Sequence, residues 1–125
     1  MEIEEAFFAS VAANFPSLDI SYPAVNFTPP NSGIWLEVTT FRNEPANQPL
    51  GNTRGVDQGI MQITVCTRPG SGMIGLRDAA NEVLAAYPKG YTFASYHRIV
   101  NNPYMLSLIV EPDKIMLPVS MSYSA

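Results

Sequence analysis

The sequence predicts an α+β fold: one antiparallel or mixed β-sheet of five to six strands with two α-helices packed on one face. Three observations predict it. Two segments repeat apolar residues at helical spacing, and several others alternate apolar with polar residues as strands do. The strand segments are grouped instead of alternating one by one with helices, which favours an antiparallel sheet. With 125 residues, 46% of them hydrophobic, the chain is expected to form a single domain over residues 1–125.

The first predicted elements are a helix and a short strand. Glu2–Asn14 carries an apolar residue at every fourth position, and Pro16 ends the helix. The stripe consists of Ile3, Phe7, Val11 and Phe15. Leu18–Tyr22 is predicted as a short strand. Residues 22–33 contain three prolines and a glycine, which predicts an extended, irregular connection.

Two longer predicted strands flank a polar loop. Ile34–Arg42 and Gln58–Arg68 both alternate. One face is expected to carry Ile34, Leu36, Val38, Met61, Ile63 and Val65, and the other Trp35, Glu37, Thr39, Gln62, Thr64 and Cys66. Asn43–Asp57, between the strands, holds two prolines and two glycines. We therefore expect a hairpin with a long tip, and loops of this length are usually functional or mobile.

A second helix and three further strands are predicted in the remaining chain. Ser71 is a plausible N-cap, and Pro88 with Gly90 ends the helix. The helix stripe is Met73, Leu76, Ala80, Val83, Leu84 and Tyr87. The strands are expected at about 92–100, 105–111 and 115–123, the last with Ile115, Leu117, Val119, Met121 and Tyr123 inward. Pro118 predicts that this last strand lies at a sheet edge or carries a bulge.

The charge balance excludes several function classes. Seven Lys and Arg against eleven Asp and Glu give a net charge of −4, so a sequence-specific nucleic-acid reader is not expected. A single cysteine excludes an internal disulfide and a cysteine-rich zinc site. No run of 18 apolar residues predicts a membrane span, and the acidic start of the chain is unlike a signal peptide. A soluble protein made in the cytoplasm is expected.

Candidate chemistry is sparse. His97 is the only histidine and Cys66 the only cysteine, and they lie on different predicted strands. One hypothesis is a small-molecule-binding domain or enzyme that uses His97 and Cys66. The alternative interpretation is that Cys66 is a small buried thiol and His97 a half-exposed histidine on a strand. The turn at residues 69–72 lacks a phosphate-loop lysine, so a helix cap explains it better than an anion site. No catalytic residue, cofactor or metal ligand is predicted, and the neutral, apolar-rich composition favours an assembly subunit.

Two blocks of sequence resemble the tail terminator-like proteins of tailed bacteriophages. The first runs from Tyr22-Pro23 through Phe27-Thr28-Pro29-Pro30 to the Trp-Leu strand at 33–38. The second contains Arg54, the Gly-Ile-Met-Gln-Ile strand at 59–63 and the Pro-Gly-Ser-Gly turn at 69–72. Relatives often have proline at the positions of Asn26 and Ile34 and arginine at Glu37, and their loop before the second block is richer in glycine and arginine. These differences concern partner contacts more than the fold.

The resemblance implies a structural role in the virion. It implies a homo-oligomer, a hexameric ring at the head-proximal end of the tail tube, which contacts the tail tube protein and a head-completion or neck protein. Duplex DNA would pass through the lumen without specific binding. Because aromatic residues dominate interface hot spots, Trp35, Phe41 and Tyr96 are candidate anchors. Arg42 and the loop residues Glu44, Asn47, Arg54 and Asp57 are candidates for contact with the tube or a neighbouring subunit.

Alternatives remain open at this point. For Trp35, packing in the core is as good an interpretation as a role at an interface. The same fold would also suit another neck component, such as a tail-completion or head-tail joining protein, and it would suit a tube-like subunit. A regulatory adaptor that binds a host protein through residues 43–57 is a further hypothesis.

Overall fold

The computed structural model describes residues 3–23, 27–28, 33–42, 58–69, 74–92 and 98–124. Its elements are α1 (Ile3–Asn14), β1 (Asp19–Ser21), β2 (Ile34–Arg42), β3 (Gln58–Thr67), α2 (Ile74–Ala86), β4 (Arg98–Ile99), β5 (Tyr104–Met105), β6 (Ile109–Val110) and β7 (Ile115–Ser124). These bounds confirm both predicted helices, the first three predicted strands and the last one. The Asn43–Asp57 loop and the Ser71 cap lie outside the described residues.

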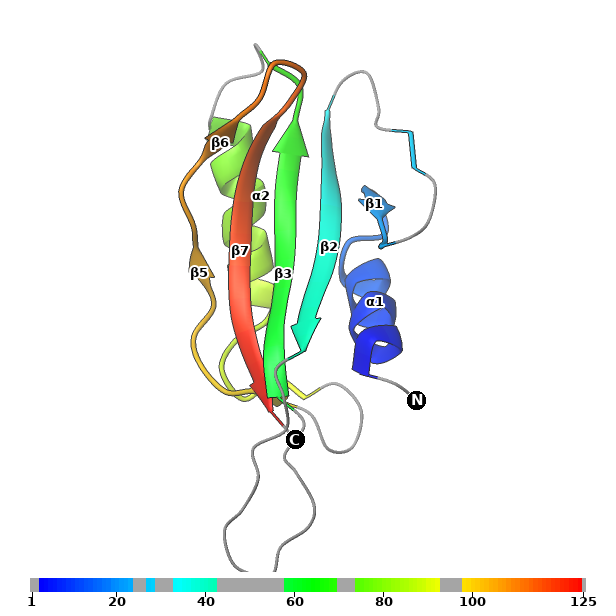
Figure 1. The fold of residues 1–125 in the computed structure, drawn as a ribbon, viewed down its shortest axis with the longest axis vertical. Coiled ribbons are helices and arrows are strands. Elements are labelled where there is room, and N and C mark those ends of the chain that lie inside the picture. Colours follow the sequence, from blue (N-terminus) through cyan, green and yellow to red (C-terminus); the bar gives the residue numbers. More distant parts are fainter. Residues whose placement is uncertain are drawn as a thin grey trace, which may run out of the picture.

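The strands form one mixed sheet in the order β1-β2-β3-β7-β4, with β5 and β6 also paired to β7 (Figure 1). β1 runs parallel to β2, and every other pair is antiparallel. The β2–β3 ladder extends from Ile34 opposite Thr67 to Arg42 opposite Gly59, which confirms the predicted hairpin strands. The sheet has seven strands, slightly more than the five to six expected, and the α+β class is confirmed.

The chain beside β7 is interrupted twice, and the second interruption shows that the strand expected at 105–111 is wrong as a continuous element. Of the strand expected at 92–100, the described part holds β4 and a bridge between Thr92 and Arg98, and residues 93–97 lie outside the described residues. From Ile99 to Tyr104 the chain advances five positions while its partners on β7 advance three. From Met105 to Ile109 it advances four positions against three. The extra residues act as bulges, which break the ladder into two-residue pieces.

Pro118 does not place its strand at an edge, because β7 lies between β3 and the β4–β6 segment. The Pro118 carbonyl oxygen accepts a hydrogen bond from the Leu106 amide at 2.8 Å. In an antiparallel ladder the amide of a residue points to the same neighbour as its carbonyl. The N–H that proline lacks therefore faces the 106–108 stretch, which forms no strand. The predicted irregularity is real, but the neighbouring segment carries it.

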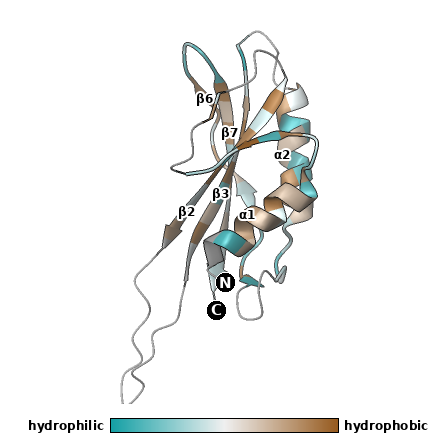
Figure 2. Cartoon of the chain, turned by 90° about the vertical axis from the view of Figure 1, so that its right-hand side faces the viewer, coloured by the Kyte–Doolittle hydropathy of each residue, from teal (hydrophilic) through white to brown (hydrophobic). Residues whose placement is uncertain are grey.

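Both helices cover the same face of the sheet (Figure 2). The inward rows of β2, β3 and β7 form the core with them, as the alternation predicted. The largest members of this core are Phe7, Leu36, Met61, Ile63, Leu76, Tyr87, Ile99, Met121 and Tyr123, all within 1% of complete burial. The core thus lies between one face of the sheet and the two helices.

A hydroxyl network connects α1 to the turn after α2. Ser10 Oγ lies 3.0 Å from the Tyr87 hydroxyl and 2.8 Å from the Tyr91 hydroxyl. The Tyr87 ring meets the Phe7 ring edge-on, with 6.2 Å between centroids. Burial raises the pKa of Tyr87 although the hydrogen bond with Ser10 opposes the shift. The network therefore keeps a neutral phenol between the helices and fixes their relative position.

Candidate interaction surface

The face of the sheet opposite the helices carries the residues that alternate with the core. Phe41, Ile60 and Ser122 lie on it toward one end, and Trp35, Cys66 and Met116 toward the other. At its centre, Glu37 of β2 lies opposite Thr64 of β3, which in turn lies opposite Pro118 of β7. Thr64, Pro118 and Ser120 are buried there, so they offer little surface to a partner.

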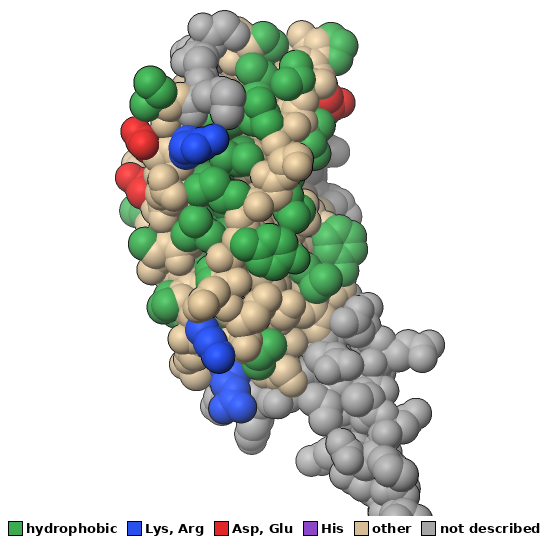
Figure 3. Space-filling view, turned by 90° about the vertical axis from the view of Figure 1, so that its left-hand side faces the viewer, with side chains coloured by type: hydrophobic (Ala, Val, Ile, Leu, Met, Phe, Trp, Pro, Cys, Tyr) green, Lys and Arg blue, Asp and Glu red, His purple; other side chains and the backbone are tan. Residues whose placement is uncertain are grey.

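The edge of the sheet beyond β7 is exposed and apolar. We call Val100, Tyr104, Leu106, Ile109 and Val110 the apolar edge. Their exposed fractions are 38%, 49%, 39%, 44% and 69%, respectively. Figure 3 views the molecule from this side and shows many hydrophobic side chains over its upper and middle parts, with Lys or Arg side chains near the top and at the lower end. Large hydrophobic residues are normally scattered singly on a protein surface, so a contiguous group of five indicates a binding surface.

No charge interrupts this surface along the chain. The segment from Ile99 to Val110 contains no Asp, Glu, Lys or Arg. An ordinary exposed edge strand is protected by charged side chains, especially lysine, against pairing with another chain. The signal for the apolar edge was therefore present in the sequence as a charge-free run, and hydrophobic periodicity alone did not reveal that these residues are exposed.

A polar cluster closes one end of the helix-free face. Glu37 Oε2 accepts hydrogen bonds from Lys114 Nζ at 3.1 Å and from Trp35 Nε1 at 3.3 Å. The Arg68 guanidinium lies 5.2 Å from the centre of the Trp35 ring and donates to the Asp113 carbonyl at 3.1 Å. Partial burial lowers the pKa of Lys114, but the hydrogen bond and charge of Glu37 outweigh it and leave that pKa above its usual value. The cluster fastens the β6–β7 turn to β2.

Trp35 and Phe41 have different environments. The Trp35 side chain is completely buried, which supports its core-packing interpretation, whereas Phe41 is 51% exposed. Arg42 ends β2, and its side chain is not among those described. The other predicted contact residues, Glu44, Asn47, Arg54, Asp57 and Tyr96, lie outside the described residues. Of the eight predicted residues, the structure describes the side chains of Trp35 and Phe41 alone, so the roles of all eight at an interface stay predictions.

Cys66 is completely buried, and its thiol donates to the Thr64 carbonyl at 3.7 Å. Burial raises the pKa of the thiol, and the nearby Glu37 charge raises it further. A buried thiol that resists ionisation is a poor nucleophile. His97, its hypothetical partner, lies outside the described residues. Within the described ranges, no three His, Cys, Asp or Glu side chains are grouped as ligands for a metal.

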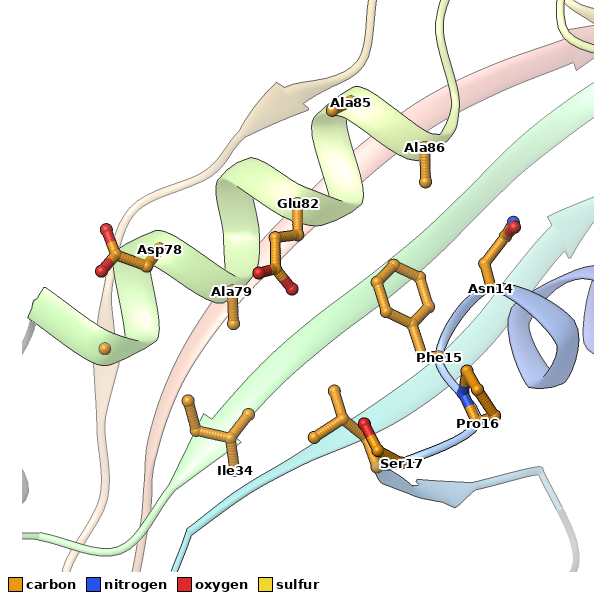
Figure 4. Close-up of a pocket in the computed structure, with 12 residues that line it drawn as sticks. Asn14, Phe15, Pro16, Ser17, Ile34, Asp78, Ala79, Glu82, Ala85 and Ala86 are labelled. Atoms are coloured by element: carbon orange, nitrogen blue, oxygen red, sulfur yellow. The ribbon is translucent and has the colours of Figure 1, made fainter.

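A groove of about 610 Å³ lies between α2 and the α1–β1 connection (Figure 4). Phe15 and Glu82 point toward this space, whereas Asp78 points away from it (Figure 4). Small residues of α2 and apolar residues form most of its other walls. One carboxylate directed into the groove does not make an acid–base pair, and no described lysine or arginine lines it.

Neither described helix has the length and apolar character to cross a membrane.

Comparison with known proteins identifies the family. A family model described as phage tail terminator protein matches residues 2–123. No curated protein sequence matches the chain. The fold is similar to a solved structure that has no functional description, with a TM-score of 0.74 and 16% identity over 99% of this chain and 96% of the other. It is also similar to a chain in the virion of a native gene transfer agent particle, with a TM-score of 0.59 and 18% identity over 98% and 95%. At such low identity these two likenesses show the fold alone, but the family match spans nearly the whole sequence and confirms the resemblance of the two sequence blocks. The chain belongs to the phage tail terminator protein family.

Proposed function

We propose that this protein is a tail terminator, a structural virion subunit that forms a hexameric ring on the head-proximal end of the tail tube and joins it to the neck. The observation that carries the proposal is the family match over residues 2–123. The family consists of structural proteins and not of enzymes. The exposed apolar edge supports the proposal, because exposed apolar surfaces of this kind are typical of contacts between proteins.

Termination in this proposal depends on unequal ring faces. One face is complementary to the last ring of the tail tube, and the other does not accept a further tube subunit, so growth stops. The opposite face then receives a head-completion or neck protein. The loop from Asn43 to Asp57 is proposed to contact the tube or a neighbouring subunit, as a long polar loop beside two rigid strands is well placed to do.

Size and charge are compatible with a conduit for DNA. A 125-residue domain has a radius of gyration of ~14 Å and a diameter of roughly 35 Å. Six such domains in contact leave a hole about one domain wide, which admits duplex DNA. The net charge of −4 disfavours retention of a polyanion as it passes.

Electron microscopy of particles made without this protein tests the proposal. Tails of irregular, extended length, restored to uniform length by the wild-type gene in trans, are the expected result. Tails of normal length that fail to attach to heads would instead identify a head-tail joining protein. Uniform, attached tails, or the absence of this chain from wild-type particles by mass spectrometry, would refute the proposal.

A further inference from the structure

We propose that the apolar edge is the surface through which one copy of this chain binds a second copy. The inference deepens the proposed function, because it names the surface through which subunits contact each other. The contact between two copies does not depend on the proposed function, whereas the ring that repeated contacts would form does. The proposed partner is another molecule of the same chain and not a different virion protein.

The first step of the argument is where exposed apolar side chains lie. Among the described residues, seven large hydrophobic side chains are exposed, and five of them belong to the apolar edge. Opposite residues in the ladder place Tyr104 beside Ser120 and Ile109 beside Met116, both on the helix-free face. Val110, opposite Ile115, turns to the helix side. The exposed groups therefore wrap both sides of one edge.

The second step concerns the backbone of the same edge. The outer side of Ile99 is occupied, because its amide donates to the Tyr91 carbonyl and its carbonyl accepts from the Gly90 amide, both at 2.8 Å. From Tyr104 onward, in the part of the chain that is described, β5 and β6 pair only with β7. An edge with unpaired backbone, exposed apolar side chains and no charge has none of the usual protection against association except its bulges. Such an edge is stable in water when another surface covers it.

The third step identifies the occupant. Copies of this chain carry −4 each, so a contact between copies gains when its surface adds no further like-charge repulsion, and residues 99–110, which hold no charged side chain, are such a surface. A basic or acidic partner protein would instead be recognised by opposite charges, which this edge lacks. The same sheet also offers an apolar group at its far side: among the described residues β1 pairs with β2 at residues 35–37, and beyond them Phe41 is half exposed.

These two edges differ, so a contact between them is head to tail. A head-to-tail contact repeats from copy to copy and closes into a ring when the rotation permits. Tyr104 is the expected anchor of the contact, because tyrosine contributes a large rigid ring and is enriched among interface hot spots.

Site-specific photocrosslinking tests the inference. p-Benzoylphenylalanine replaces Tyr104, or Ala85 as a control, since Ala85 is exposed on the groove side of α2. The isolated protein, over a wide concentration range, and purified particles are both irradiated, and the products are mapped by mass spectrometry. We expect Tyr104→p-benzoylphenylalanine to give a product of twice 13.7 kDa joined to a second copy, and the Ala85 variant to give none.

Equilibrium sedimentation provides the second measurement. Tyr104→Lys is expected to weaken self-association at least about tenfold, and Ala85→Lys, which adds the same charge, is expected to leave it unchanged. Circular dichroism confirms that both variants are folded. Crosslinks from Tyr104 to a different virion protein, no crosslink in either sample, or equal effects of the two lysine variants would overturn the inference. Absence of the chain from particles would refute the proposed function, whereas self-crosslinking of the isolated protein would still support this contact.

Discussion

Gly59 in β3 occupies a position where a methyl group has no room. It lies opposite Arg42 on β2 and Tyr123 on β7. A Cβ at this position would overlap the carbonyl oxygen of Phe41 and would lie 2.8 Å from the Tyr123 hydroxyl oxygen and 3.0 Å from its Cε1. Carbon atoms in favourable contact are about 3.5–4.0 Å apart. The substitution Gly59→Ala therefore forces β3 away from both neighbours at the end of the β2–β3 ladder.

The expected loss of stability follows from two opposing effects. Overpacking of a well-packed site costs about 1–3 kcal/mol. The smaller conformational freedom of alanine in the unfolded chain returns about 0.4–1 kcal/mol. Because a backbone oxygen cannot rotate out of the way, we expect the steric cost to dominate, with a net loss of roughly 1–2 kcal/mol. For a domain of this size that corresponds to a fall in Tm of roughly 3–12 °C.

Gly75 provides the matched control. Its added Cβ would lie 3.9 Å from Ile34 Cδ1, an ordinary contact, and the residue lies within α2. Gly75→Ala should stabilise the protein by about 0.5–1 kcal/mol, because alanine favours helix. Urea titration and thermal unfolding of the wild type and both variants measure the two effects. A Gly59→Ala variant at least as stable as the wild type would refute the reasoning.

Three further predictions concern buried or paired polar groups. The free energy of unfolding should fall above about pH 8.5, with a slope that approaches roughly 1.4 kcal/mol per pH unit as the thiol of the unfolded chain becomes fully ionised, because burial keeps Cys66 protonated only in the folded state. A Cys66→Ala variant with the same fall as the wild type between pH 8.5 and 9.5 in urea titrations would contradict this reasoning. Tyr87→Phe should cost about 1 kcal/mol, since it removes the hydrogen bond with Ser10. In a double-mutant cycle Ser10→Ala should show coupling to Tyr87→Phe and a further cost of its own, because Ser10 also contacts the Tyr91 hydroxyl; two strictly additive effects would contradict the shared hydrogen bond. Lys114→Met should cost at most about 1 kcal/mol at low salt and progressively less in high salt, because the pair with Glu37 is partly exposed. Since the pKa of Lys114 is raised in the folded state, the contribution of the pair is complete below about pH 10.4 and is lost as the pH rises through that higher pKa. A cost of Lys114→Met that does not change with salt would argue against the pair.

The local periodicity of the sequence predicted most of the elements and their inner faces. Alternation in Ile34–Arg42 and Ile115–Tyr123 requires only that one face be buried, and the structure buries that face. The four-residue spacing of Phe7, Val11 and Phe15 predicted the first helix for the same reason. Each of these signals depends on neighbours in the chain, so it could be interpreted without knowledge of the tertiary structure.

The candidate site was much less predictable. Trp35 alternates with core residues and was a plausible anchor, but it is buried on the other face of the sheet. Residues 100–110 were expected to contribute strands, whereas their interruptions follow from register with β7 and from the missing N–H of Pro118. Exposure of Tyr104 is a property of the sheet order, because nothing described pairs beyond it.

By itself, the sequence determined the fold class, the inward residues and, through its two characteristic blocks, the family. Only the tertiary structure decided that β7 is an inner strand, that β1 joins the sheet in parallel and that a charge-free edge is exposed. The physical reason is the range of the interactions. Periodic burial acts between residues two to four positions apart, whereas strand order, bulges and exposed edges depend on backbone pairing between segments that are distant in the chain.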